Sequence, residues 1–251
     1  MTSADQDTEQ PLVHHLIELR TRLMRIVVFI AIAFFALFNF SNQIYGFVSA
    51  PLQKLLPANT SMIATDVISP FLTPMKLTLV VALFGSIPFI LYQIWAFIAP
   101  ALYKHEKGIA IPLLVSSVLL FYTGVAFSYF VVLPLIFGFI TNVGLEGVAT
   151  MTDITKYLDF VLQMFFAFGF AFEIPVATII LIHAEIVSAR SLIKKRPYII
   201  VGCFVIGMIL TPPDVMSQIT LAVPMWILFE VGVYIGLMIE KRKLKDEVTS
   251  S

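Results

Sequence analysis

The chain has 251 residues, of which 59% are hydrophobic and 13% are charged, and its mean hydropathy is +0.94. A soluble domain carries about 25% charged residues, so this composition indicates an integral membrane protein. The formal net charge is zero, which argues against nucleic acid as a partner because phosphate binding needs a basic surplus. Cys203 is the only cysteine, which excludes an intramolecular disulfide and a thiolate metal cluster.

The first ten residues are acidic, with Asp5, Asp7 and Glu9 among them. A cleavable signal peptide begins instead with a basic segment, so we expect the N-terminus to be retained.

Six stretches are apolar enough to be considered as membrane spans, because a spanning helix needs about 20 mainly apolar residues. They are residues 23–40, 75–99, 109–137, 157–183, 198–210 and 219–239. The fifth is short: at about 1.5 Å rise per residue it falls well below a hydrocarbon core of about 30 Å. A chain with five spans is therefore the alternative. Pro88 and Pro134 lie inside spans, where we expect each to kink its helix.

The distribution of Lys and Arg predicts that both termini are cytoplasmic, because basic residues concentrate in cytoplasmic loops. With six spans, one side of the membrane carries only Lys54, Lys76 and Lys156. The remaining basic residues fall on the side of the two termini: Arg20, Arg22, Arg25, Lys104, Lys107, Arg190, Lys194, Lys195, Arg196, Lys241, Arg242, Lys243 and Lys245.

This topology predicts a single polytopic membrane domain. Residues 1–22 form a cytoplasmic N-terminal segment, residues 23–239 a six-helix transmembrane region and residues 240–251 a cytoplasmic tail. Two sizeable outer loops cover about residues 41–74 and 138–156, and within the first we expect residues 44–56 to form a short interfacial helix.

Two glutamates lie next to basic residues just outside apolar stretches. Glu18 is followed at helical spacing by Arg22, and Glu106 lies in the Lys104–Lys107 cluster. The topology places both on the cytoplasmic side, where a pair of carboxylates suits a cationic partner. The simpler interpretations are a solvated ion pair for Glu18 with Arg22 and a solvated polar turn for the second cluster.

Glu173 lies well inside the fourth apolar stretch, where an exposed charge costs about 2.5–3.5 kcal/mol or more. We expect it to be protonated, paired or hydrated, and functional by default; a buried structural hydrogen bond is the alternative. Glu230 is shallower, and a structural or interfacial role is equally open. Gly232 and Gly236 form a GxxxG pattern, for which packing within the chain is the favoured use.

Met208, Thr211 and Gln218 form a small polar patch at the outer end of the fifth span. By itself this patch indicates little. The chain has no phosphate-binding loop, no HExxH, no GxSxG and no cluster of His and Cys at ligand spacing. We therefore expect no catalytic residue, no cofactor, no metal site and no enzymatic activity.

Four blocks of sequence stand out: His15-Leu16-Ile17-Glu18-Leu19-Arg20-x-Arg22, Ser49-Ala50-Pro51-Leu52, Phe97-x-x-Pro100-x-Leu102-Tyr103-x-x-Glu106 and Leu210-Thr211-Pro212-Pro213-Asp214. They resemble the signature blocks of the TatC family, the large membrane subunit of the twin-arginine (Tat) protein translocase. The resemblance runs from about residue 11 to 238, with the blocks in family order.

The resemblance implies an all-α membrane protein whose six helices form a curved, glove-like bundle with a concave face open to lipid. It implies a bacterial cytoplasmic (inner) membrane location and an oligomeric complex with the single-span subunits TatA and TatB. The substrates it implies are folded proteins that carry a signal peptide with two consecutive arginines.

The resemblance also implies roles for individual residues. Positions corresponding to Glu18 and Glu106 recognise the arginine pair, and those of Arg20, Arg22, Phe97, Pro51 and Asp214 are sensitive to change. Glu173 matches a buried glutamate on the concave face. Met208, Thr211 and Gln218 match the docking site of the small subunits. A recognition site made of carboxylates suits a signal peptide with two arginines, because the planar fork of arginine binds carboxylate bidentately whereas lysine offers a point charge.

The leading hypothesis is a receptor subunit of a protein-export machine driven by the proton-motive force. The alternative is a proton-coupled secondary transporter of small solutes that uses Glu173 as proton carrier. Such carriers usually show internal repeats and broken helices around a midplane site, and neither is evident in the sequence. A membrane scaffold without a substrate is a third hypothesis.

Overall fold

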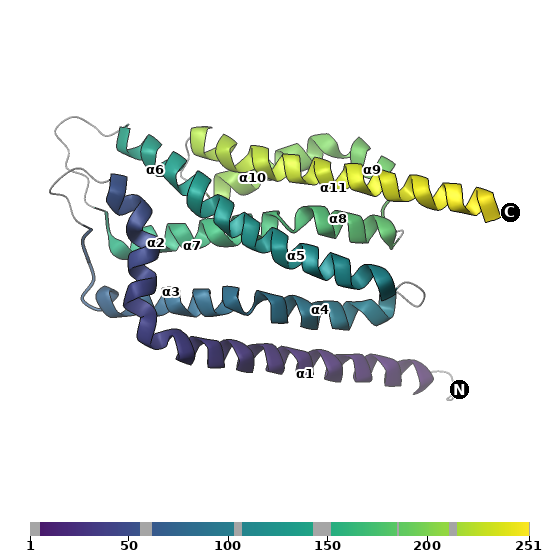
Figure 1. Ribbon diagram of the computed structural model, residues 1–251, viewed down its shortest axis with the longest axis horizontal. Coiled ribbons are helices and arrows are strands. Elements are labelled where there is room, and N and C mark those ends of the chain that lie inside the picture. The colour runs from purple at the N-terminus through teal and green to yellow at the C-terminus, as the bar shows by residue number, and fades with distance from the viewer. Residues whose placement is uncertain are drawn as a thin grey trace. The chain divides into compact units, whose positions relative to one another are not determined.

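The computed structural model describes residues 6–55, 62–102, 107–142, 152–184, 186–210 and 215–250. These residues are almost entirely helical (Figure 1), which confirms the expected all-α class; the β pairing among them is an isolated bridge between Ile63 and Asp153. The α-helices are α1 (Gln6–Leu37), α2 (Ser41–Leu55), α3 (Ser69–Gly85), α4 (Ile87–Leu102), α5 (Lys107–Phe127), α6 (Leu133–Asn142), α7 (Ile154–Ala171), α8 (Ile174–His183), α9 (Ala189–Lys194), α10 (Arg196–Leu210) and α11 (Val215–Ser250).

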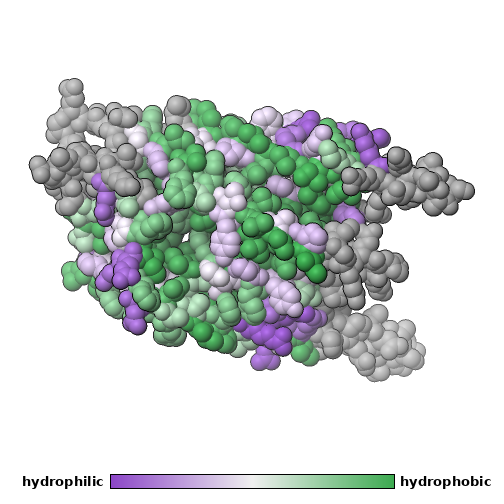
Figure 2. Space-filling view, in the orientation of Figure 1, coloured by the Kyte–Doolittle hydropathy of each residue, from purple (hydrophilic) through white to green (hydrophobic). Residues whose placement is uncertain are grey.

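Four helical segments in the described part are long and apolar enough to cross a membrane: Leu16–Ala50, Ile111–Phe139, Ile154–His183 and Gln218–Lys241. The bent pair α3–α4 makes a fifth if it is one span. α10 contains the shorter apolar segment Arg196–Ile209, so the expected shortness of this stretch is confirmed. The count of six spans and the cytoplasmic termini stay predictions. The space-filling view in Figure 2 is mostly hydrophobic, as expected for helices that face lipid.

The helices gather in two compact units. The first comprises Met1–Val48 and Pro70–Val118, and in it α1 packs along α4. Phe29 of α1 stacks on Phe89 of α4 with 4.5 Å between ring centroids. The second unit comprises Ser49–Ser69 and Leu119–Ser251. The single membrane domain stays a prediction.

The two expected proline kinks have different outcomes. Pro88 lacks the backbone N–H that would continue the helix, and α3 and α4 meet there at 49°, so this kink is confirmed. Next to Pro134 the helix contains instead a π-helical turn, η2 (Ser128–Val132), and Ile111–Phe139 remains one segment. The wider turn accommodates the proline ring without a break. The helix expected at residues 44–56 is present as α2, and its interfacial location stays a prediction.

In the second unit, α11 packs closely on α8 through the GxxxG pattern. A Cβ atom at Gly232 would lie 2.8 Å from Cα of Pro175, and one at Gly236 would meet the Cδ1 atom of Ile182. At Gly232 the close atom belongs to the backbone of α8, so the lack of a side chain there allows this approach. The favoured interpretation of the pattern, packing within the chain, is therefore confirmed.

Glu230 of α11 accepts a hydrogen bond from Arg196 of α10, with 2.5 Å between Oε2 and Nη2. The ion pair is partly buried and joins the start of α10 to the middle of α11. Of the two roles left open for Glu230, the contacts support the structural one.

Asp153 caps the N-terminus of α7 and joins it to the segment before α3. Its Oδ1 accepts from the backbone N–H of Thr155 and Lys156 at 2.9 and 3.0 Å. Its Oδ2 accepts from the hydroxyl and the backbone N–H of Thr65 at 2.6 and 3.0 Å. The Thr65 hydroxyl, followed by these N–H groups, lowers the pKa of Asp153 from 3.8 to about 2.

We expect the stability contributed by Asp153 to depend on pH below about 4. Because the pKa is lower in the folded state, this contribution is complete above the unfolded value of 3.8 and is lost as the pH falls through about 2. Asp153→Asn should remove this pH dependence. The measurement is the difference in thermal unfolding midpoint between wild type and variant from pH 2 to 6, with Asp66→Asn as control. A difference that stays constant over this range would contradict the expectation.

Candidate functional site

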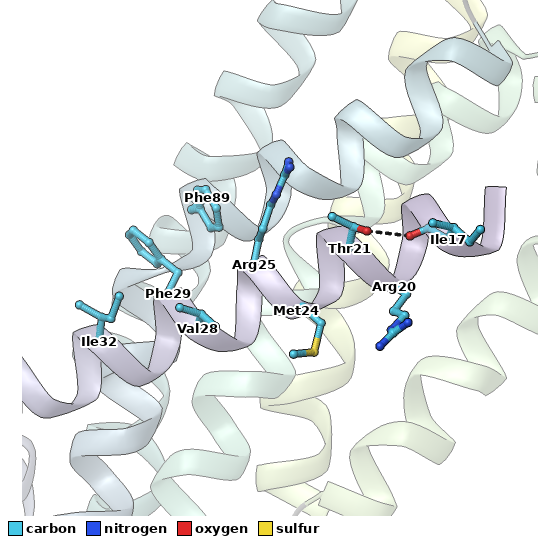
Figure 3. Close-up of a pocket in the computed structure, with 9 residues that line it drawn as sticks. All are labelled: Ile17, Arg20, Thr21, Met24, Arg25, Val28, Phe29, Ile32 and Phe89. Atoms are coloured by element: carbon cyan, nitrogen blue, oxygen red, sulfur yellow. Dashed lines mark hydrogen bonds between the residues drawn. The ribbon is translucent and has the colours of Figure 1, made fainter. Parts of the chain in front are cut away.

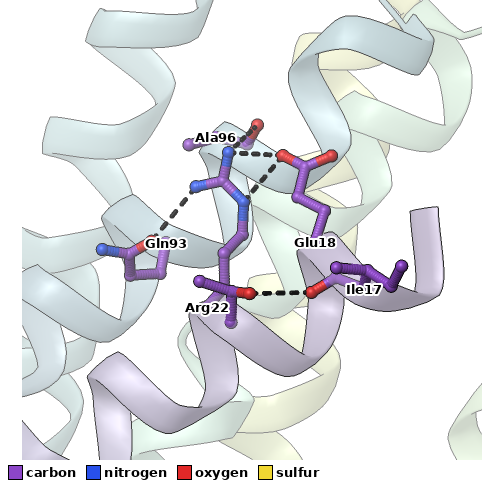
Figure 4. A network of polar contacts seen from close by, with 6 residues as sticks. Ile17, Glu18, Arg22, Gln93 and Ala96 are labelled. Carbon is purple, nitrogen blue, oxygen red and sulfur yellow. Dashed lines mark hydrogen bonds and ion pairs between the residues drawn. The ribbon is translucent and has the colours of Figure 1, made fainter. Parts of the chain in front are cut away.

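A polar network joins α1 to α4 around Arg22 (Figure 4). The Nε and Nη2 atoms of Arg22 both donate to Oε1 of Glu18, at 2.9 and 2.6 Å. Across the helix pair, Nη1 donates to Oε1 of Gln93 at 3.1 Å and Nη2 donates to the carbonyl oxygen of Ala96 at 3.2 Å. The expected ion pair between Glu18 and Arg22 is therefore present. Its arginine also contacts α4, so the pair is not simply solvated on one helix.

The contribution of this network to holding Glu18 in place depends on how far its side chains are buried. Gln93 is 5% exposed, and the side chains of Arg22 and Glu18 are 19% and 32% exposed. An exposed pair four residues apart contributes a few tenths of a kcal/mol. Here a carboxylate, an amide oxygen and a backbone carbonyl all accept from one rigid guanidinium, which sets the side-chain geometry of Glu18. Electrostatic contacts are stronger where water is partly excluded.

The other residues expected at this site lie on the same two helices or outside the described part. Arg20 is exposed on α1, and Phe97 is half-buried on α4, directly after Ala96. Glu106 lies outside the described residues. The structure therefore brings Glu18, Arg22 and the α4 segment that carries Phe97 together, and the approach of Glu106 to Glu18 stays a prediction.

Glu173 lies at a break between α7 and α8. α7 ends at Ala171, and Pro175 near the start of α8 cannot donate the hydrogen bond that would continue the helix. Glu173 is half-buried, its Oε1 atom is buried, and its carbonyl oxygen accepts from the N–H of Ala177 at 2.9 Å. Glu173 is the N-cap residue of α8, its side chain makes no capping hydrogen bond, and Ile154–His183 continues through this turn as one helical segment.

Of the three residues expected to form a docking patch, two are described. Met208 is 56% exposed on α10. Gln218 of α11 donates from Nε2 to the carbonyl oxygen of Phe204 at 3.0 Å, and its side chain packs against Gly207. The amide of Gln218 therefore holds α11 against α10 beside the exposed Met208 side chain. Thr211 lies outside the described residues.

The two remaining expected site residues have limited descriptions. Pro51 lies within α2, and Asp214 lies outside the described residues. In the described part of the chain, no three His, Cys, Asp or Glu side chains come together as a metal site.

Sequence reasoning missed Gln93 and the carbonyl of Ala96. The available signal was a lone amide inside an apolar stretch, since such a group needs a buried partner. It also missed Asp153, although an acidic residue directly before an apolar helix is a typical N-cap.

Comparisons with known proteins agree with this fold and these motifs. The family model for TatC, described as Sec-independent protein translocase protein, matches residues 14–224. A TatC from Azotobacter chroococcum mcd 1 is 61% identical over 95% of this chain and 94% of its own length. The TatC of Escherichia coli strain K12 is 59% identical over 91% of this chain and 88% of its own. A crystal structure described as the twin arginine translocase receptor TatC superposes with a TM-score of 0.79 at 38% identity, covering 89% of this chain and 98% of that one.

The fold is that of an all-helical membrane protein with a charged network between two of its helices, and its relatives are protein translocases. The chain belongs to the TatC family. Members of this family are components of the Tat protein translocase and work with other Tat subunits.

Proposed function

We propose that this chain is the receptor subunit of a bacterial twin-arginine translocase. It binds the signal peptide of folded precursor proteins at the cytoplasmic face of the inner membrane and nucleates assembly with TatA and TatB, driven by the proton-motive force. Glu18 and Glu106 bind the two arginines, with Arg20 and Phe97 beside them. Arg22 acts through Glu18.

The observation that carries this proposal is the guanidinium already held by Glu18 between α1 and α4. Both Arg22 contacts converge on Oε1 of the carboxylate. Two hydrogen bonds from one rigid guanidinium fix the orientation of this carboxylate beside α4. Arg22, Gln93 and Ala96 thereby hold Glu18 ready to bind an arginine.

Co-purification tests the proposed function. The protein in detergent is mixed with a folded precursor that carries two arginines in its signal peptide, or two lysines in the same positions. We expect the arginine precursor to be retained and the lysine precursor to be lost, because an ammonium group cannot form the bidentate contact. Equal retention of both would contradict recognition of the arginine pair.

The same protein also tests the alternative of a solute transporter. In reconstituted vesicles with a proton gradient, a transporter would accumulate labelled solutes without a precursor. Precursor binding without solute uptake would support the receptor. If the protein shows neither precursor binding nor solute uptake, the scaffold is the supported function.

We also propose that Met208, Thr211 and Gln218 dock the transmembrane helix of a small partner subunit. Support comes from the exposure of Met208 next to a helix pair that is held together by Gln218. Met208→Cys should form a specific disulfide adduct with a cysteine in the partner's span. Val118→Cys on α5 serves as the control, and adducts formed equally well from it would contradict the docking site.

Glu173 is proposed to contact a polar group on an incoming partner helix at a concave, lipid-open surface. Glu173→Gln keeps the hydrogen-bonding capacity at the start of α8 and should have a mild effect. Glu173→Leu removes that capacity and should impair transport while leaving signal-peptide binding intact. The measurements are export and signal-peptide crosslinking for both variants. Full export by the Leu variant would reject the role, and equal damage by Gln would assign it to the ionisable proton.

A further inference from the structure

A groove of about 550 Å³ runs along α1 in the first unit (Figure 3). Its residues lie on α1 except for Phe89, which α4 contributes. The polar residues of its lining, Arg20, Thr21 and Arg25, lie towards the N-terminal end of the groove, where Ile17 and Met24 accompany them. Further along α1 its lining is apolar. The groove therefore combines a basic end with a hydrophobic end.

The two arginines of the groove differ from Arg22 in their contacts. Arg22 makes four hydrogen bonds to Glu18 and α4. Arg20 and Arg25 are exposed, and within the described part of the chain neither makes a side-chain hydrogen bond or ion pair. In Figure 3 they extend from opposite sides of α1 and flank the groove. Two positive charges without a described carboxylate partner favour an anion between them.

The apolar end is left uncovered by the described residues of the first unit. Met24, Val28 and Ile32 each expose more than half of their surface. They belong to the helical segment Leu16–Ala50, and no residue in the most apolar part of that segment is buried. The stacked rings of Phe29 and Phe89 form its side wall. Since these residues lie in a membrane span, what covers them is hydrocarbon.

We propose that this groove binds one phospholipid with an anionic headgroup. The phosphate lies between Arg20 and Arg25, and an acyl chain follows Met24, Val28 and Ile32. A zwitterionic lipid matches the apolar end equally well but has less attraction for the two guanidinium groups. The described lining of the groove contains two arginines and no carboxylate, which favours an anionic headgroup over a cationic one. The proposal does not depend on the function proposed above.

Retention of lipid by the purified protein tests this inference. The full chain in mild detergent, without any signal peptide, is mixed with dioleoylphosphatidylglycerol or dioleoylphosphatidylcholine, and bound lipid is counted by native mass spectrometry. We expect each chain to retain one phosphatidylglycerol molecule in preference to phosphatidylcholine. Arg25→Gln should weaken its retention about fivefold. Arg190→Gln removes an exposed charge that belongs to the second unit and should change nothing.

A second variant separates the groove from general surface charge. Val28→Trp fills the apolar end without changing any charge and should also reduce retention of phosphatidylglycerol. Size-exclusion profiles confirm that each variant is folded. Equal retention of the two lipids by the wild type would overturn the proposal. So would undiminished retention of phosphatidylglycerol by both folded variants.

Discussion

Glu18→Gln is expected to weaken crosslinking of a twin-arginine precursor between about tenfold and about 100-fold. The charge-assisted hydrogen bond that it removes contributes about 1.5–3 kcal/mol, and each 1.4 kcal/mol corresponds to about tenfold in affinity. Export should fall with binding, while membrane insertion and abundance stay unchanged. Glu106→Gln should act in the same direction, and the double variant should lose detectable binding. Unchanged binding by the double variant would reject the proposed site.

The structure adds a control that separates recognition from support. Glu18 also holds Arg22, so its loss leaves a partly buried guanidinium with fewer acceptors. The double variant Glu18→Gln with Arg22→Gln removes both charges. If Glu18 binds the precursor directly, binding stays weak in this variant. Recovery of binding would assign the effect of Glu18→Gln to the stranded arginine instead.

Arg22→Lys gives the complementary result. A lysine keeps the charge, but the donors of its single ammonium nitrogen cannot replace contacts that Arg22 makes from three separate nitrogens, Nε, Nη1 and Nη2. We expect precursor binding to weaken while the discrimination between arginine and lysine signal peptides persists.

Gly232→Ala is expected to destabilise the protein by about 1–3 kcal/mol through overpacking. The new Cβ would lie 2.8 Å from Cα of Pro175 and 3.1 Å from Cβ of Thr178. The first of these atoms is backbone, so α8 and α11 must move apart. The measurement is the thermal unfolding midpoint in detergent, monitored as the loss of the monodisperse size-exclusion peak after heating.

Two other glycines provide matched controls. A Cβ at Gly202 of α10 would have no neighbouring atom within 4 Å, so Gly202→Ala should be neutral or stabilise by about 0.5–1 kcal/mol, since alanine favours the helix. A Cβ at Gly236 meets only the flexible end of Ile182. Gly236→Ala should therefore be milder, and Ile182→Val, which deletes the obstructing Cδ1 atom, should recover part of its loss. Equal effects at Gly232 and Gly202 would contradict close packing at α8.

Properties that depend on local sequence could be predicted. Hydropathy and length identify the helical segments, because a helix satisfies its own backbone hydrogen bonds inside a membrane. The proline at position 88 marks the bend between α3 and α4 for the same local reason. The spacing of Glu18 and Arg22 predicts their ion pair, since residues four apart are neighbours on a helix.

Only the tertiary structure decided the contacts between residues far apart in the chain. Arg22 and Gln93 are 71 positions apart, and Thr65 and Asp153 are 88 apart. No local pattern selects these partners, because which faces of two helices meet depends on how all side chains pack. Glu173 shows the same limit: its hydropathy context indicates a costly charge, whereas the burial of its Oε1 atom at the turn between α7 and α8 depends on how the helices pack.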